Sequence, residues 1–224
     1  MNRQLFLHEE LTLLALRDQS GTIASGTNYE YAIGGAVLAE LLLEGRVTFE
    51  TNGKKKFLQL TTSKPLGDPI IDECLQKVVD AKRRAQLRTW VSRFAHVKKL
   101  KHKLAKQLCR RGILRSDEDR VLLVFSRRIY PEINPEPERQ IMDRLRDAIF
   151  TDTDQVEPRT AVLLSLAKST GVLKANFDKH TLKTRKDRIE RIINGEVTGK
   201  ATKEAIDAMK AAVMVAIMYS CGIY

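Results

Sequence analysis

Residues 95–114 read AHVKKLKHKLAKQLCRRGIL, a stretch with an apolar repeat, seven lysines and arginines, and no carboxylate. Its apolar residues recur at steps of three and four, which is the spacing of one face of an α-helix. They are Val97, Leu100, Leu104 and Leu108. We therefore expect a helix that packs into the core by its leucines and presents cations to an anionic partner.

The positive charge of the chain is concentrated around this stretch. The 224 residues carry 39 lysines and arginines against 28 acidic residues, which gives a formal net charge of +11. Residues 82–115 contain 13 of these cations and no acidic residue, so this segment alone exceeds the net charge. A local cationic patch of this kind favours a phosphate-bearing partner, either a membrane surface or a nucleic acid.

No motif in the sequence indicates catalysis or metal binding. The three cysteines are far apart and form no Cys-x-x-Cys, which fits a reducing compartment without a disulfide framework or a zinc site. Phosphate-binding loops, nucleophile elbows and zinc-protease motifs are absent from the sequence. We expect a protein that is not an enzyme, with no catalytic residue, no metal and no cofactor.

Neither apolar end of the chain predicts a membrane anchor. Residues 5–16 are apolar but include Glu9 and Glu10 and are followed by no cleavage pattern, unlike a signal peptide. Residues 211–219 are apolar but shorter than the roughly 20 residues that a membrane-spanning helix needs. We expect a cytoplasmic protein whose contact with membranes is peripheral.

Hydrophobic periodicity predicts a mainly α-helical fold with two or more small peripheral β-hairpins, in a single globular domain over residues 1–224. The small residues Ala32, Gly34, Gly35 and Ala36 are expected to let another backbone approach closely. The predicted helices cover residues 5–17, 29–44, 70–81, 85–94, 96–111, 138–150, 158–170, 181–194 and 203–219.

Two hairpins are predicted, each after a helix that ends at a glycine. The first covers residues 47–60, with its turn at Asn52-Gly53, and the second covers residues 113–125, with an acidic turn at residues 117–119. A helix followed by glycine and a hairpin is the plan of a winged-helix unit. DNA binding through such units is therefore the alternative function.

Four short motifs, at matching spacing, resemble the Golgi phosphoprotein 3 family, which includes the yeast vacuolar sorting protein 74. The resemblance runs in order from about residue 9 to residue 219. The motifs are LTLLALRD at residues 11–18 before Gly21, AELLLEGRV at 39–47, LAKQL at 104–108 with GIL at 112–114, and LAK at 166–168 with VLKANF at 172–177.

This resemblance implies a mostly helical domain that acts as a peripheral membrane adaptor. In the eukaryotic members it implies a protein on the cytosolic face of the Golgi that binds phosphatidylinositol 4-phosphate. There it links the cytoplasmic tails of membrane enzymes, the glycosyltransferases, to vesicle coats. The resemblance also implies a homo-oligomer formed through a hairpin at about residues 114–130. The residues of that hairpin expected to make the oligomer contact are Leu114, Val121, Leu123 and Phe125.

The headgroup site that the resemblance implies is half present in this chain. The family's tryptophan falls near Ser25 or Gly26 and its arginine at Gly34, so neither is matched. Its two cations match lysines of the basic helix, and a histidine shares their face. The predicted site for an anionic phospholipid headgroup therefore consists of Lys98, Lys101 and His102.

Overall fold

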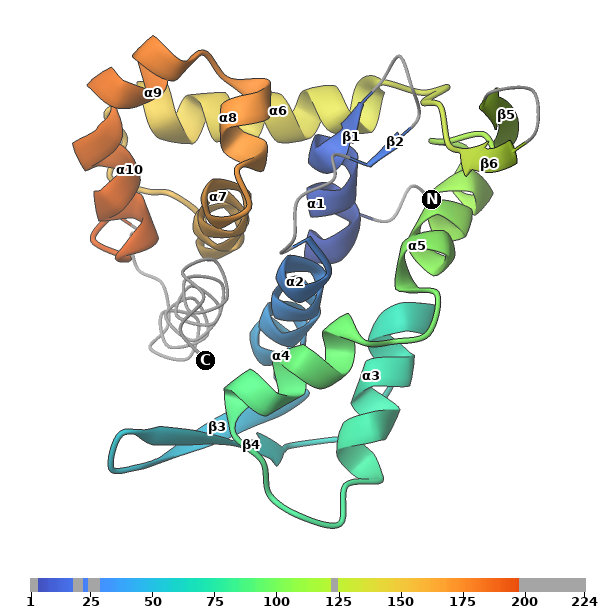
Figure 1. The fold of residues 1–224 in the computed structure, drawn as a ribbon. Coiled ribbons are helices and arrows are strands. Elements are labelled where there is room, and N and C mark those ends of the chain that lie inside the picture. Colours follow the sequence, from blue (N-terminus) through green and yellow to red (C-terminus); the bar gives the residue numbers. More distant parts are fainter. Residues whose placement is uncertain (1–3, 18–21, 24–28, 122–124, 198–224) are drawn as a thin grey trace.

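The computed structural model describes residues 4–17, 22–23, 29–121 and 125–197, and it is mainly α-helical, as predicted (Figure 1). The helices of the described part are α1 Leu7–Ala15, α2 Tyr29–Leu43, α3 Pro69–Val79, α4 Leu87–Ala95, α5 Leu100–Arg110, α6 Glu136–Phe150, α7 Pro158–Ser169, α8 Val172–Asn176, α9 Lys179–Thr184 and α10 Lys186–Ile193. Its strands are β1 Leu16–Arg17, β2 Thr22–Ile23, β3 Val47–Asn52, β4 Lys55–Leu60, β5 Asp117–Val121 and β6 Phe125–Ile129.

Helix α2 lies at the centre of the hydrophobic core. It packs against α1, α4 and α7 (Figure 1). Its buried residues lie on all sides of the helix axis. A helix that is apolar all round is suited only to the interior. The core around it is one continuous cluster that draws on residues from α1 through α10.

Helices α2 and α4 cross in close contact at Gly34, as the run of small residues predicts. A Cβ atom at this position would lie 2.5 Å from the Val91 carbonyl oxygen and 2.9 Å from the Ala95 amide nitrogen. Both are backbone atoms of α4, which cannot rotate aside. The position to which the resemblance assigns an arginine therefore has no room for any side chain here.

The basic stretch forms two helices, α4 and α5, joined by residues 96–99. The second helix begins at Leu100, later than predicted, because the chain turns sharply at Lys99. That residue has φ +57°, the one positive φ outside glycine in the described residues. The apolar repeat from Val97 to Leu108 is buried, as predicted. It fixes the rotation of α5 about its own axis.

The first predicted hairpin is confirmed, with its loop one residue further along. Strand β3 pairs with β4 from Val47–Leu60 to Asn52–Lys55, which leaves Gly53 and Lys54 as the loop. Gly53 has φ +57°, a left-handed conformation that glycine adopts at little cost.

The predicted acidic turn at residues 117–119 is wrong, because these residues begin strand β5. The register places position 118 opposite Arg128 and position 119 opposite Arg127. The backbone pairing of β5 with β6 runs through these positions, whereas a turn would interrupt it.

The residues predicted for an oligomerising hairpin are not grouped together on it. Leu114 precedes β5 and is buried in the core of its own chain, while Val121 and Phe125 occupy the last paired position of the hairpin. Leu123 lies outside the described residues, as do Ser25, Gly26 and the helix predicted for residues 203–219. Oligomerisation through this hairpin stays a prediction.

Two other predicted helices are shorter or divided in the structure. The helix predicted for residues 5–17 ends at Ala15, because Leu16 and Arg17 pair with Thr22 and Ile23 as a short ladder. The helix predicted for residues 181–194 is divided at Arg185, whose guanidinium donates to the Phe150 carbonyl oxygen at 2.9 Å. No helix of the described chain is long and apolar enough to cross a bilayer.

Buried carboxylates on α1 and α2 join the helices to one another. Glu40 accepts two hydrogen bonds from Arg159 of α7, at 2.6 and 3.0 Å, and a third from the Leu7 amide at 2.8 Å. Glu9 accepts from Arg111, just after α5, at 2.7 Å. Glu10 forms an ion pair with Arg144 of α6 at 2.9 Å.

The N-terminus of α3 is tied to the same cluster. Asp68 caps this helix by accepting hydrogen bonds from the Ile70 and Ile71 amides. Gln107 of α5 donates to Asp68 and also to Glu9. Helices α1, α3 and α5 are therefore joined by polar contacts as well as by their apolar faces.

We expect Gly34→Ala to lower the free energy of unfolding by about 2–3 kcal/mol, because its Cβ meets rigid backbone. Gly35→Ala is the matched control, since its Cβ would meet only the Leu166 side chain, at an ordinary 3.5 Å. It should raise stability by about 0.5–1 kcal/mol through helix propensity. Urea unfolding of both variants measures the difference, and equal effects would contradict the close crossing.

We expect Arg159→Ala to cost about 3–5 kcal/mol, because it leaves the buried Glu40 carboxylate without its counter-ion. Arg146→Ala removes an exposed arginine paired with Asp143 and should cost less than about 1 kcal/mol. Chemical denaturation tests both. A loss at Arg159 no larger than that at Arg146 would show that the buried pair does not hold α2 to α7.

Candidate anion-binding site

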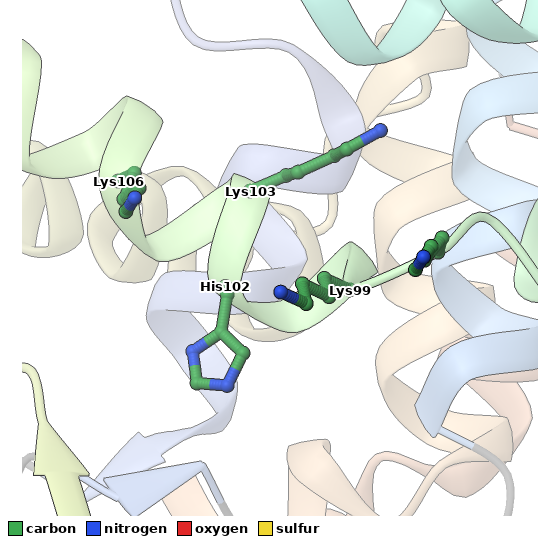
Figure 2. Close-up of a pocket in the computed structure, with 5 residues that line it drawn as sticks. Lys99, His102, Lys103 and Lys106 are labelled. Atoms are coloured by element: carbon green, nitrogen blue, oxygen red, sulfur yellow. The ribbon is translucent and has the colours of Figure 1, made fainter.

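Helix α5 and the connector before it place five basic side chains around one open hollow. The hollow has a volume of about 710 Å³. We call it the lysine hollow, and Figure 2 shows how its side chains lie. No acidic residue of the described chain lines it. Its lining residues are Lys98, Lys99, His102, Lys103 and Lys106.

The helical repeat explains why these side chains gather on one side. Lys99, His102, Lys103 and Lys106 are spaced by three and four residues and so lie on one face of the helix. The leucines of α5 occupy another face and are buried. Because core packing fixes the rotation of α5, its cations are held toward solvent.

Only part of this charge is compensated within the molecule. Lys103 extends away from His102 in Figure 2 and forms an ion pair with Glu73 of α3. Lys98, Lys99 and Lys106 have no ion pair with any described residue. The hollow therefore holds three uncompensated ammonium groups, a charge pattern suited to a phosphate or another anion.

The imidazole of His102 is held at the edge of the hollow. Its Nδ1 lies 2.9 Å from the Tyr130 hydroxyl, and the two rings are 6.2 Å apart. One ring nitrogen is therefore engaged by Tyr130. This contact orients the ring beside the lysines.

The N-terminus of α5 adds a favourable electrostatic field. Its N-cap residue is Lys99, which makes no side-chain cap, and the first turn contains no acidic residue. The amide groups and dipole at a helix N-terminus favour an anion. Here cations occupy the turn where an acidic residue would ordinarily be stabilising.

A second hollow of about 470 Å³ lies beside the first and contains a carboxylate. It shares Lys99 and His102 with the lysine hollow. Its other polar lining residues are Glu30, Tyr31, His96 and Lys101. Lys101 Nζ lies 2.8 Å from Glu30 Oε1. Burial would raise the pKa of Glu30, but the hydrogen bond and charge of Lys101 hold that pKa below its usual value.

The structure thus separates two of the three predicted site residues. Lys98 lines the lysine hollow, whereas Lys101 lines the second hollow, where Glu30 compensates its charge. His102 lines both hollows. Lys99 and Lys106 belong to the same basic stretch but are not among the predicted site residues. Glu30 and Glu73 gave no local signal, because only the tertiary fold brings them to α5.

The described residues contain no group of three or more histidine, cysteine or acidic side chains that could hold a metal ion. Cys74 is buried on α3, which raises the pKa of its thiol, and Cys109 is half-buried on α5. The described part of the site therefore supports binding of an anion through cations, without metal ligands.

Comparison with known proteins points to one family. The family model for Golgi phosphoprotein 3 (GPP34) matches residues 7–209. The vacuolar protein sorting-associated protein 74 of Schizosaccharomyces pombe is 24% identical over 139 residues, which is 54% of this chain and 41% of that protein. The alignment thus spans less than half the length of this curated relative.

We expect Glu30→Gln to tighten the binding of inorganic phosphate about two- to fivefold, because Lys101 loses its internal counter-ion. An NMR titration that follows the His102 imidazole measures the dissociation constant. Asp143→Asn, which removes an exposed ion-paired carboxylate on α6, is the control and should change nothing. Unchanged affinity in Glu30→Gln would mean that Lys101 lies beyond the reach of the ligand.

Proposed function

Because this chain belongs to the Golgi phosphoprotein 3 family, we propose that it is a peripheral membrane adaptor that binds anionic lipid headgroups through the lysine hollow. The observation that carries the proposal is the hollow itself, in which Lys98, Lys99 and Lys106 face solvent without ion pairs to described residues. Phosphate groups are the anions that such a cluster binds at a membrane surface.

The expected strength of this contact suits a reversible, peripheral role. Each lysine near an anionic leaflet contributes about 1 kcal/mol, so three give about 3 kcal/mol. That is too little for stable attachment unless a phosphorylated headgroup also enters the hollow. A hollow of about 710 Å³ has room for such a headgroup.

Phosphatidylinositol 4-phosphate is the headgroup that we propose, since it is the one that the family resemblance implies. Its phosphate would lie among the lysines, and its ring hydroxyls could donate to Glu30 in the adjoining hollow. The family's arginine cannot be accommodated at Gly34. Selectivity in this chain would therefore rest on the lysines and on Glu30.

As an adaptor, the protein would connect the membrane to other proteins. We propose the cytoplasmic tails of membrane enzymes as its cargo and, in a eukaryotic cell, the cytosolic face of the Golgi as its location. Self-association through the β5–β6 hairpin would multiply the number of lysine hollows at one surface and so strengthen a weak individual contact.

DNA binding is the alternative, and the arrangement of helices favours it less. Both helix–glycine–hairpin units are present, since Gly45 and Gly112 have positive φ and precede hairpins. However, α2 is buried in the core and cannot enter a DNA groove. A gel-shift titration with duplex DNA distinguishes the two functions, because the proposed adaptor should show no saturable, sequence-dependent complex.

We expect Lys98→Glu combined with Lys106→Glu to reduce vesicle binding at least about tenfold, because it replaces two attractive charges near the leaflet by repulsive ones. Co-sedimentation with vesicles containing phosphatidylinositol 4-phosphate, and with phosphatidylserine vesicles of equal charge, measures the effect and the headgroup preference.

The matched control is Lys174→Glu combined with Lys183→Glu, which makes the same charge change at exposed positions of α8 and α9. These helices lie across the molecule from α5 (Figure 1). Binding that falls equally in both variants would reflect net charge alone and would contradict a site at the lysine hollow. Equal binding to both kinds of vesicle would contradict the proposed headgroup.

A further inference from the structure

A groove between strand β4 and the connector from α3 to α4 has features of a protein-docking site. It has a volume of about 550 Å³ and is formed by Leu58 to Leu60, the end of α3, residues 81–85 and Trp90. We call it the Trp90 groove. We propose that it binds an extended, acidic segment of a partner protein, with one apolar side chain of that segment seated in the groove.

Two large apolar side chains line this groove and remain unusually open to solvent. Leu60 is 42% exposed and Val79 is 37% exposed. The described residues include only one other large hydrophobic side chain with comparable exposure, Ile133. Covering Leu60 and Val79 would remove apolar surface from water, which is the main driving force for docking.

The Trp90 indole provides a hydrogen-bond donor that lacks an acceptor. The residue is only 2% exposed, and its Nε1–H has no acceptor in the described chain. The Arg93 guanidinium lies 4.5 Å from the centre of the ring and covers one face. Buried indole N–H groups usually have a partner. Trp90 lines the groove, so a bound segment that displaces neighbouring side chains could bring an oxygen to this donor.

The backbone of β4 can pair with an extended segment along the groove. The Leu58 amide donates to the Ala85 carbonyl oxygen at 3.1 Å, so the connector already pairs with this edge at one position. Alternation along an antiparallel strand turns the Leu60 amide to the same side. At Leu60, β4 and the connector flank the groove. A partner strand that enters the groove could pair with β4 at this position.

The charges around the groove select an acidic partner. Lys82 and Arg83 line it and form no ion pair with described residues. The neighbouring Arg84 is already occupied, since it lies 2.5 Å from Glu50 and over the Phe57 ring. No acidic residue of the described chain lines the groove. Acidic groups on both sides of an apolar residue would complement this rim.

A flat membrane surface fits the groove less well than a peptide does. The groove lies between a strand and a connector, and the unpaired donor is buried. A bilayer has no peptide backbone with which to extend the β4 ladder. The membrane is therefore kept as an alternative outcome of the test.

The test is a selection of displayed random peptides on the full chain. We expect enrichment of peptides that carry an apolar residue flanked by aspartate or glutamate. Because Trp90 is the only tryptophan of the chain, a selected peptide without tryptophan can be titrated by intrinsic fluorescence. The emission should change on binding, and its dependence on peptide concentration gives the dissociation constant.

Lys82→Glu combined with Arg83→Glu should weaken peptide binding at least about tenfold. The control, Lys54→Glu combined with Lys55→Glu, makes the same charge change at the tip of the same hairpin and should bind normally. Leu60→Asp tests the apolar contact separately. Circular dichroism establishes that each variant is folded.

The proposal is overturned if no acidic peptide is enriched, if the groove and control variants bind equally, or if the groove variant loses binding to anionic vesicles instead. The last result would assign the groove to the membrane surface. Peptide binding should survive in the Lys98→Glu and Lys106→Glu variant, so failure of the lysine hollow and failure of the groove give different results.

Discussion

The arrangement of the described helices depends on pairing three buried carboxylates with arginines that lie far away in the sequence. Glu9, Glu10 and Glu40 are inaccessible to water, and each would strongly destabilise the fold without a counter-ion. Burial raises the pKa of Glu10 although Arg144 and Arg159 oppose that shift. Replacing any of these arginines by a neutral residue would leave a charge in the interior.

This buried cluster also determines which face of α5 is available for binding. Gln107 and Arg111 reach inward to Glu9, and the leucines of α5 are buried beside them. With these side chains fixed, Lys99, His102 and Lys106 can only face outward. The proposed membrane contact is therefore a consequence of how the core is held together.

Apolar spacing and cap chemistry predict most of the fold, because they act over one or two turns. The buried leucines of α5 and the Asp68 cap follow from such local patterns. Residues 117–119 carry the local signal of a turn but form a strand, because their pairing partner β6 lies further along the chain. The division of the basic stretch into two helices follows from the sequence, but no glycine or proline marks the turn at Lys99 that delays the second helix to Leu100.

The candidate site was less predictable, because its charge balance is set by residues distant in sequence. Residues 82–115 contain no acidic residue, yet the fold brings carboxylates to several of their cations. Lys101 meets Glu30, Lys103 meets Glu73 and Arg84 meets Glu50. Sequence alone identified the basic helix but could not show which of its lysines remain uncompensated.

The large sequence separation between the partners of the buried ion pairs has a consequence for synthesis of the protein. Arg111 follows its partner Glu9 by 102 residues, and Arg159 follows Glu40 by 119 residues. Glu9 on α1 and Glu40 on α2 therefore stay without these counter-ions until the later residues have been made. Until Arg159 has emerged, α1 and α2 cannot be buried together at low cost. The native core around α1 and α2 therefore closes only after Arg159 has been made.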